Sequence, residues 1–121
     1  MSFRINIIEA TTSNTDYRRE LFTAAHSQLV VMALKPGSEI GKEVHPDHDQ
    51  ILVCVQGHGK AILNGNEKTF TKNDLVVVPA GTEHNFINTG STDLKLYTIY
   101  APAHHAAGTV HATQEDASKY E

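Results

Sequence analysis

Glu43 and His45 are two side chains, one acidic and one basic, that stand two positions apart and could act on the same ligand. They alternate in a short extended segment that ends at Pro46, so a carboxylate and an imidazole point to the same side of the chain. Gln50 begins the next apolar segment, and His84 begins a later one. Carboxylate and amide oxygens and imidazole nitrogens all bind divalent cations. The three segments must come together in the fold before their side chains can act at one site.

The segments around these residues have the pattern of β-strands. Apolar residues recur with period two or form short β-branched runs, and Gly, Pro, Asn and Asp close each run. Short, evenly spaced strands favour a sandwich or barrel over a parallel sheet with crossover helices. We therefore predict an all-β fold, with strands at residues 28–34, 50–56, 60–63, 67–70, 75–78, 84–88 and 94–100.

One turn and two helices are also predicted from local signals. Asn64-Gly65 separates two of the expected strands, and this pair is the strongest short hairpin signal because both central residues of a type I′ turn take positive φ. We expect a tight hairpin there. The two candidate helices are residues 15–23, with Asp16 near a possible cap, and residues 114–119.

The overall composition limits the kind of protein that this is. The 121 residues match the size of one domain, and 40% hydrophobic with 20% charged residues is typical of a globular chain. A net charge of −4 without any Lys/Arg cluster disfavours nucleic acid and membrane surfaces as partners. Without a signal-like N-terminus or a long apolar run, we expect a cytoplasmic protein. The single cysteine, Cys54, lies in an apolar run and predicts a core thiol.

Residues 37–57 resemble the first motif of the cupin superfamily, in which a glycine precedes two alternating histidines, a glutamate follows and a glycine closes the hairpin. Gly37 and Gly57 match the two glycines. The second motif of the superfamily is similar to the segment 79–88, where Pro-Ala-Gly is followed by His84 and then by Asn88.

The length between the motifs is also similar to that of small single-domain cupins, since fifteen residues separate Gly57 from Asn73. Asn73 stands where the family has glycine, and asparagine tolerates the left-handed backbone angles required there. The resemblance implies an antiparallel jelly-roll β-barrel. It implies one cupin domain over residues 1–121, with a motif core at about 29–100, an N-terminal segment at 1–28 and a C-terminal tail at 101–121.

The resemblance also implies a ligand set for the metal. Glu43 and His45 take the paired histidine positions, Gln50 takes the glutamate position, and His84 is the histidine of the second motif. We expect these four side chains to hold one divalent ion, either Fe, Mn, Ni or Zn, with no other cofactor. The exchange of positions keeps one anionic ligand, and two histidines with one carboxylate are also the ligands of non-haem Fe(II) enzymes.

The other histidines are assigned less definite roles. We expect the turn at residues 46–47 to direct His48 to the rim of the barrel, away from the metal. Three more histidines lie in the C-terminal tail, which we interpret as a mobile segment, with a second metal site as the alternative. They are His104, His105 and His111.

Residues 97–111 resemble a segment of small cupins described as similar to mannose-6-phosphate isomerase. The similarity implies a metal-dependent isomerase or lyase that acts on a sugar-like small molecule. The alternatives are a non-haem iron dioxygenase and a non-catalytic protein that binds or senses a small ligand. We also expect a homodimer, because cupins of this kind pair and the apolar run at residues 3–8 could add to a neighbour's sheet edge.

Overall fold

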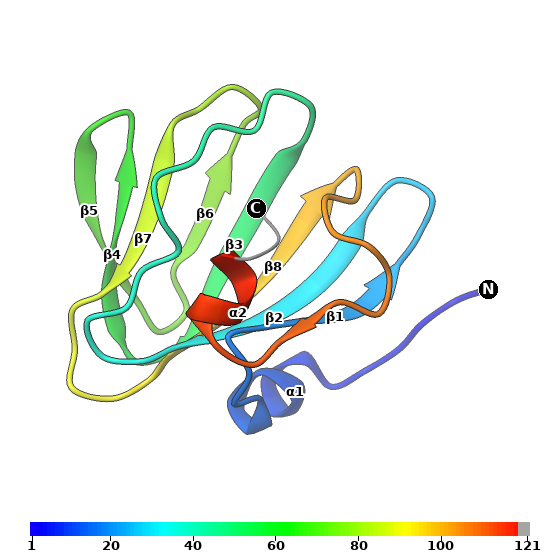
Figure 1. Cartoon of the computed structure of the whole chain (residues 1–121), viewed down its shortest axis with the longest axis horizontal. Coiled ribbons are helices and arrows are strands. Elements are labelled where there is room, and N and C mark those ends of the chain that lie inside the picture. Colours follow the sequence, from blue (N-terminus) through cyan, green and yellow to red (C-terminus); the bar gives the residue numbers. More distant parts are fainter. Residues whose placement is uncertain (119–121) are drawn as a thin grey trace.

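The computed structural model describes residues 1–118, which form two antiparallel sheets that face each other (Figure 1). The larger sheet has the order β6-β3-β8-β2-β1-β9, and the smaller has the order β5-β4-β7. This is the antiparallel jelly-roll architecture predicted from the sequence. The strands are β1 Arg18–Thr23, β2 Gln28–Leu34, β3 Asp49–Gln56, β4 His58–Leu63, β5 Asn66–Thr71, β6 Leu75–Val78, β7 His84–Asn88, β8 Leu94–Ala101 and β9 Val110–His111.

The core lies between the two sheets and consists of every second residue of the long strands. Leu52 and Cys54 of β3 and Leu96 of β8 are fully buried, which confirms the predicted core position of the thiol. Phe70 of β5 packs edge-on against Phe86 of β7, with ring centroids 5.1 Å apart. Burying each such side chain stabilises the fold by about 2 kcal/mol, so the strands that carry the site form a rigid frame.

The hairpin predicted at Asn64-Gly65 is confirmed. Leu63 of β4 pairs with Asn66 of β5, so the loop has two residues, and its φ angles of 49° at Asn64 and 83° at Gly65 are those of a type I′ turn. Asn73 has a φ of 74°, which confirms the left-handed conformation expected at that position.

The helix predicted at residues 15–23 is wrong, because most of this segment forms β1. Arg19 pairs with Val31 of β2 on one side and with Val110 of β9 on the other. The local residue types favour a helix only weakly, and the backbone hydrogen bonds of two neighbouring strands outweigh that preference.

The N-terminal helix is instead α1 Ile7–Ser13, which packs on β8, β3 and β2. Its N-cap is Asn6, whose side-chain oxygen accepts a hydrogen bond from the Glu9 amide at 3.0 Å. Two residues of the apolar run 3–8 therefore lie in a helix rather than in an edge strand, and the homodimer stays a prediction. At the other end, α2 is Gln114–Ser118, and Lys119 of the predicted helix lies outside the described residues. Within residues 1–118 no helix combines the length and the apolar character that a membrane span requires.

Candidate metal centre

The segment of Glu43 and the start of β7 meet backbone to backbone. The amide of Glu43 donates to the carbonyl of His84, and the amide of His84 donates to the carbonyl of Glu43, each at 2.9 Å. Directly opposed residues of an antiparallel pair place their side chains on the same face. His45, two residues further along, is fixed by the Gly81 amide, which donates to its carbonyl at 2.9 Å. The two sequence motifs are thus joined at the site.

Glu43, His45 and His84 are in contact with one another as a result. The His45 Nε2 lies 3.5 Å from a carboxylate oxygen of Glu43, and the rings of His45 and His84 have centroids 5.1 Å apart. The Nδ1 of His84 lies 2.9 Å from the carbonyl oxygen of Thr82, to which it donates in the tautomer that leaves Nε2 with a lone pair. Such a second hydrogen bond is usual for a histidine that binds a metal.

Gln50 enters the site from β3, and its side chain is 3% exposed. Its amide nitrogen donates to the Thr98 hydroxyl at 3.0 Å, while its amide oxygen is buried and has no hydrogen-bond partner within the described part of the chain. An unpaired buried oxygen costs about 1–3 kcal/mol. A divalent cation would supply the missing interaction, so the donor set fits the ion that the sequence implies. The ligand role of the four residues stays a prediction.

His48 departs from its expected place, because it points inward and is 8% exposed. Its ring stacks on His45 with centroids 4.5 Å apart, so the predicted position at the rim is wrong. The reason is a contact at the start of β3, where a carboxylate oxygen of Asp49 accepts a hydrogen bond from the Ala80 amide at 2.8 Å. This contact holds residues 46–48 against the Pro-Ala-Gly turn and directs His48 into the barrel.

The described part of the C-terminal tail, residues 101–118, is also structured rather than loose. His111 lies in β9, which pairs with β1, and its Nδ1 lies 3.2 Å from a guanidinium nitrogen of Arg18. Arg18 is 2% exposed, and the sequence alone gives no reason to place it at the site. His104 lies beside His45 and His48, with ring centroids 4.6 Å from each. The spacing His45-x-x-His48 indicates that these two histidines could act together. His104 lies 56 positions after His48, so only the fold shows that it belongs to the same group.

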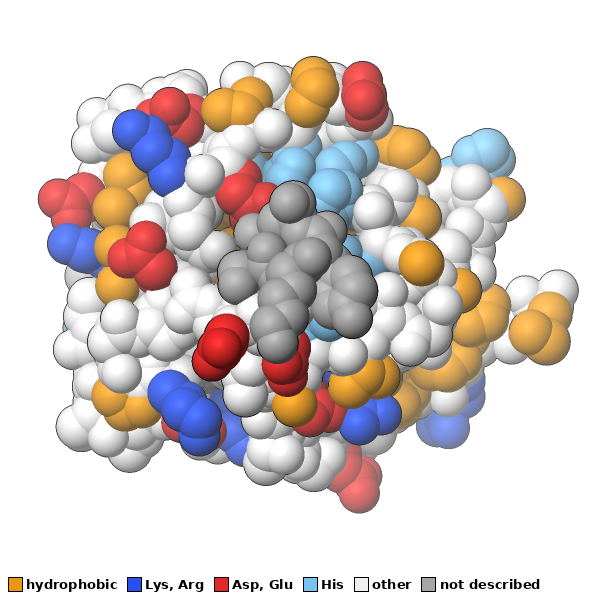
Figure 2. Space-filling view, viewed as in Figure 1, with side chains coloured by type: hydrophobic (Ala, Val, Ile, Leu, Met, Phe, Trp, Pro, Cys, Tyr) orange, Lys and Arg blue, Asp and Glu red, His pale blue; other side chains and the backbone are white. Residues whose placement is uncertain are grey.

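A cavity of about 790 Å³ opens beside these residues. Figure 2 shows histidine side chains, in pale blue, gathered on this face of the molecule. The wall combines one guanidinium, one carboxylate, four imidazoles and a few small or apolar groups. The lining residues are Arg18, Glu43, Val44, His45, His104, His105, Ala106, Thr109, Val110 and His111.

Lowered pKa values favour the neutral form of four imidazoles in and beside the cavity, those of His45, His48, His104 and His105. Burial, followed by the nearby His104, His48 and His84, lowers the pKa of His45 to about 4. Burial is also the main cause that lowers the pKa of His48 and of His104. The pKa of His105 is lowered to about 3 by burial and by the Arg18 charge. Neutral imidazole is the form that binds a metal, so these side chains need not release protons first at neutral pH.

Comparison with known proteins agrees with this architecture. The family model described as Cupin domain matches residues 30–100. The uncharacterised protein YrkC of Bacillus subtilis is 48% identical over 122 residues, which cover 95% of this chain and 65% of YrkC. This chain thus spans less than two thirds of the length of that relative. A solved structure from Bacillus halodurans has a TM-score of 0.97 at 38% identity, covering 98% of this chain and 95% of that one.

A more distant match has a named ligand. The oxalate-binding protein of Thermotoga maritima is 31% identical over 68 residues, which cover 56% of this chain and 56% of that protein. Its name gives a small, oxygen-rich anion as its ligand.

Proposed function

Because this chain belongs to the cupin family, we propose that it is a metal-dependent isomerase or lyase that acts on a small, oxygen-rich, sugar-like molecule. The observation that carries the proposal is the convergence of the Glu43 carboxylate with the imidazoles of His45 and His84. The buried amide oxygen of Gln50, which has no hydrogen-bond partner in residues 1–118, supports the same conclusion, because a bound cation would provide the interaction that it lacks.

Glu43, His45, Gln50 and His84 would hold the divalent ion, which when bound supplies a Lewis acid that polarises an oxygen of the substrate. The chain's own residues then position that substrate. The Thr98 hydroxyl keeps the amide of Gln50 oriented, and the carbonyl of Thr82 keeps the ring of His84 oriented. Such fixed orientations lower the reorganisation that the site must undergo during the reaction.

The rest of the cavity wall indicates the substrate class. A neutral imidazole offers both a hydrogen-bond donor and an acceptor, which suits hydroxyl groups. His105 is held neutral, its buried Nε2 has no hydrogen-bond partner among residues 1–118, and it lines the cavity. Arg18 adds positive charge to the same wall. The named oxalate ligand of the Thermotoga maritima protein is consistent with an oxygen-rich substrate that carries a carbonyl or carboxylate group.

The test is proton exchange on candidate substrates, followed by proton NMR in deuterated water. A panel of aldoses, ketoses and sugar acids is incubated with chain loaded with Fe(II), Mn(II), Ni(II) or Zn(II), and with chain treated with a chelator. We expect the loaded chain to exchange the proton next to a carbonyl, or to eliminate water, and we expect chelation to abolish both. His84→Ala should lower the rate by about a hundredfold, since it removes a ligand that orients the ion. The control His58→Ala changes an exposed histidine of β4 and should retain the rate.

The alternative functions give other results in the same experiment. Consumption of dissolved oxygen with a substrate, only in the Fe(II) form, would identify a dioxygenase and overturn the isomerase or lyase. Saturable binding of a panel member without exchange, elimination or oxygen uptake would identify a non-catalytic binding protein.

A further inference from the structure

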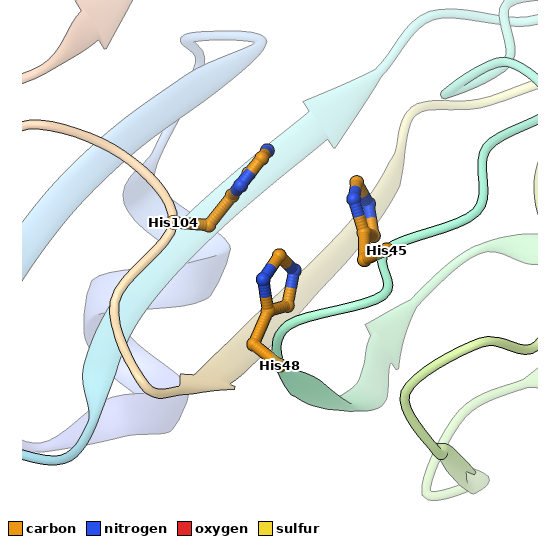
Figure 3. A group of neighbouring side chains, drawn as sticks. All are labelled: His45, His48 and His104. Atoms are coloured by element: carbon orange, nitrogen blue, oxygen red, sulfur yellow. The ribbon is translucent and has the colours of Figure 1, made fainter.

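A second group of ligand-competent side chains lies next to the set that the motifs supply. His45, His48 and His104 each offer one ring nitrogen, and these nitrogens all lie within 4.8 Å of one another. Figure 3 shows the three rings turned toward a common space, although they come from the segment before β3 and from the loop after β8. We call these three residues the outer set, and Glu43, His45, Gln50 and His84 the inner set.

His104 is held at this place by Gln28 of β2. The side chain of Gln28 is 1% exposed, and its oxygen accepts the backbone amides of His104 at 3.1 Å and of His105 at 2.9 Å. Its amide nitrogen donates to the carbonyl of His105 at 2.6 Å. One buried side chain thus satisfies three backbone groups of the loop, and the position of His104 is built rather than accidental.

His48 is the member of the outer set whose bonding is incomplete. Its Nε2 is buried and has no hydrogen-bond partner in residues 1–118, although its ring packs on His45 and edge-on to Tyr100 at 5.4 Å. Burying an imidazole nitrogen without a partner is unfavourable. A cation bound between the three rings would satisfy that nitrogen, and it would explain why three imidazoles lie so close without hydrogen bonds between them.

We propose that His45, His48 and His104 form a second metal position, which takes a borderline divalent ion such as Zn(II) or Co(II) on three imidazole nitrogens. Three nitrogens with a fourth place for water form the usual open tetrahedral geometry of such ions. Because both sets need His45, the chain holds one ion in one position at a time. The inner set offers two oxygens and suits harder ions, whereas the outer set offers only nitrogen.

The test is Co(II) binding by chains in which one set is removed. Bound metal is counted by plasma mass spectrometry, and the visible absorption that is specific to Co(II) on three imidazole nitrogens reports the outer position. His84→Ala removes the inner set, and we expect it to keep about one Co(II) per chain with that absorption. His104→Ala should keep the ion in the inner set but lose the absorption. Adding His104→Ala to His84→Ala should weaken binding at least tenfold, and His48→Ala in the same background should do the same.

Each of the other possible results overturns one of the two metal positions or both. If His84→Ala loses its ion while His104→Ala keeps it with an unchanged spectrum, the outer position is wrong and the inner site stands. If His104→Ala alone loses the ion and His84→Ala resembles the unmodified chain, the outer position stands and the ligand set of the proposed function fails. An unmodified chain that takes up no Co(II) overturns both. His58→Ala is the matched control, and circular dichroism of each variant shows that it is folded.

Discussion

The inner and outer sets differ in what holds them in place. Glu43 and His84 of the inner set sit on paired backbones, and Gln50 lies within β3 between two neighbouring strands. In the outer set, His48 and His104 lie in loops whose positions depend on the side chains of Asp49 and Gln28. Strand pairing fixes side-chain direction by alternation, whereas a loop residue is fixed only by the particular contacts that its loop makes.

The same region of the molecule thus contains a site placed by sheet register and a site placed by individual hydrogen bonds. The first should resist changes in distant residues, because many ladder bonds support it. The second should fail when one anchor is removed. Five changes to the chain or its conditions should separate the two sets, and their expected effects decrease in the order given.

His45→Ala should have the largest effect, because His45 belongs to both sets. We expect Co(II) and Fe(II) affinities to fall by about a hundredfold or more, since each position loses an imidazole. Isothermal titration calorimetry on metal-free chains measures both affinities. A fall for only one of the two metals would show that the sets do not share His45, and His58→Ala serves as the control.

Gln28→Ala should separate the two sets. Removing its three hydrogen bonds to the loop of His104, together with its bond to the Thr23 hydroxyl, frees that loop. The outer position should then lose about tenfold in Co(II) affinity, and the free energy of unfolding should fall by about 2 kcal/mol. The exchange activity that depends on the inner set should be retained. Cobalt titration and urea unfolding provide the measurements.

The matched control for this change is Gln114→Ala, at an exposed glutamine whose amide donates to the Glu39 carbonyl at 2.5 Å. It should leave both quantities unchanged. Equal losses of Co(II) affinity from Gln28→Ala and Gln114→Ala would mean that the loop of His104 does not depend on its anchor.

Gln50→Ala should have a smaller effect, confined to the inner set. A neutral amide is the weakest of the four ligands, so we expect about a threefold to tenfold loss of Fe(II) affinity and little change in the outer position. Gln50→Glu should act in the opposite direction, because a second carboxylate attracts the cation more strongly. Tighter Fe(II) binding by Gln50→Ala than by Gln50→Glu would contradict a ligand role for this residue.

The smallest expected effect is that of pH on Co(II) affinity. It distinguishes imidazoles whose pKa is lowered from imidazoles with the usual pKa of about 6.5. The pKa of His45 is lowered to about 4 and those of His48 and His104 are also lowered, so each of the three stays neutral to a lower pH than an ordinary imidazole. Co(II) affinity of the outer position should therefore change less between pH 7.5 and 6.5 than it would with three unperturbed imidazoles, which would lose about sixfold. Titrations at several pH values in the His84→Ala chain test this, with a fall expected as the pH approaches 4.

The same lowered pKa values determine how the metal-free fold responds to acid. The unfolded chain takes up protons on its histidines near pH 6.5, while the folded chain does not until the pH is much lower. Stability is therefore present above pH 6.5 and is lost as the pH falls from 6.5 toward 4. Urea midpoints measured at pH 7, 6 and 5 should fall in that order, and a constant midpoint would show that the folded chain does not lower the pKa of these imidazoles.

Much of the fold was predictable because its signals are local. Alternation of apolar residues placed the strands, and Asn64-Gly65 fixed a hairpin whose loop has two residues. The wrong predictions concern segments whose local residue types favour neither helix nor strand strongly. Residues 15–23 became a strand through pairing with β2 and β9, and the Asn6 cap with Glu9 three positions later was the overlooked sign of α1.

The family, the all-β class and the face on which Glu43 and His45 lie could be predicted from the sequence, since each depends on spacing and alternation within short segments. The surroundings of that face could not, because they depend on how distant segments pack. His104 lies 76 positions after Gln28 and still further from Arg18, and no local rule connects it with either residue. They meet because β1, β2 and the loop after β8 pack side by side, and contacts between distant segments arise from the packing of the whole chain.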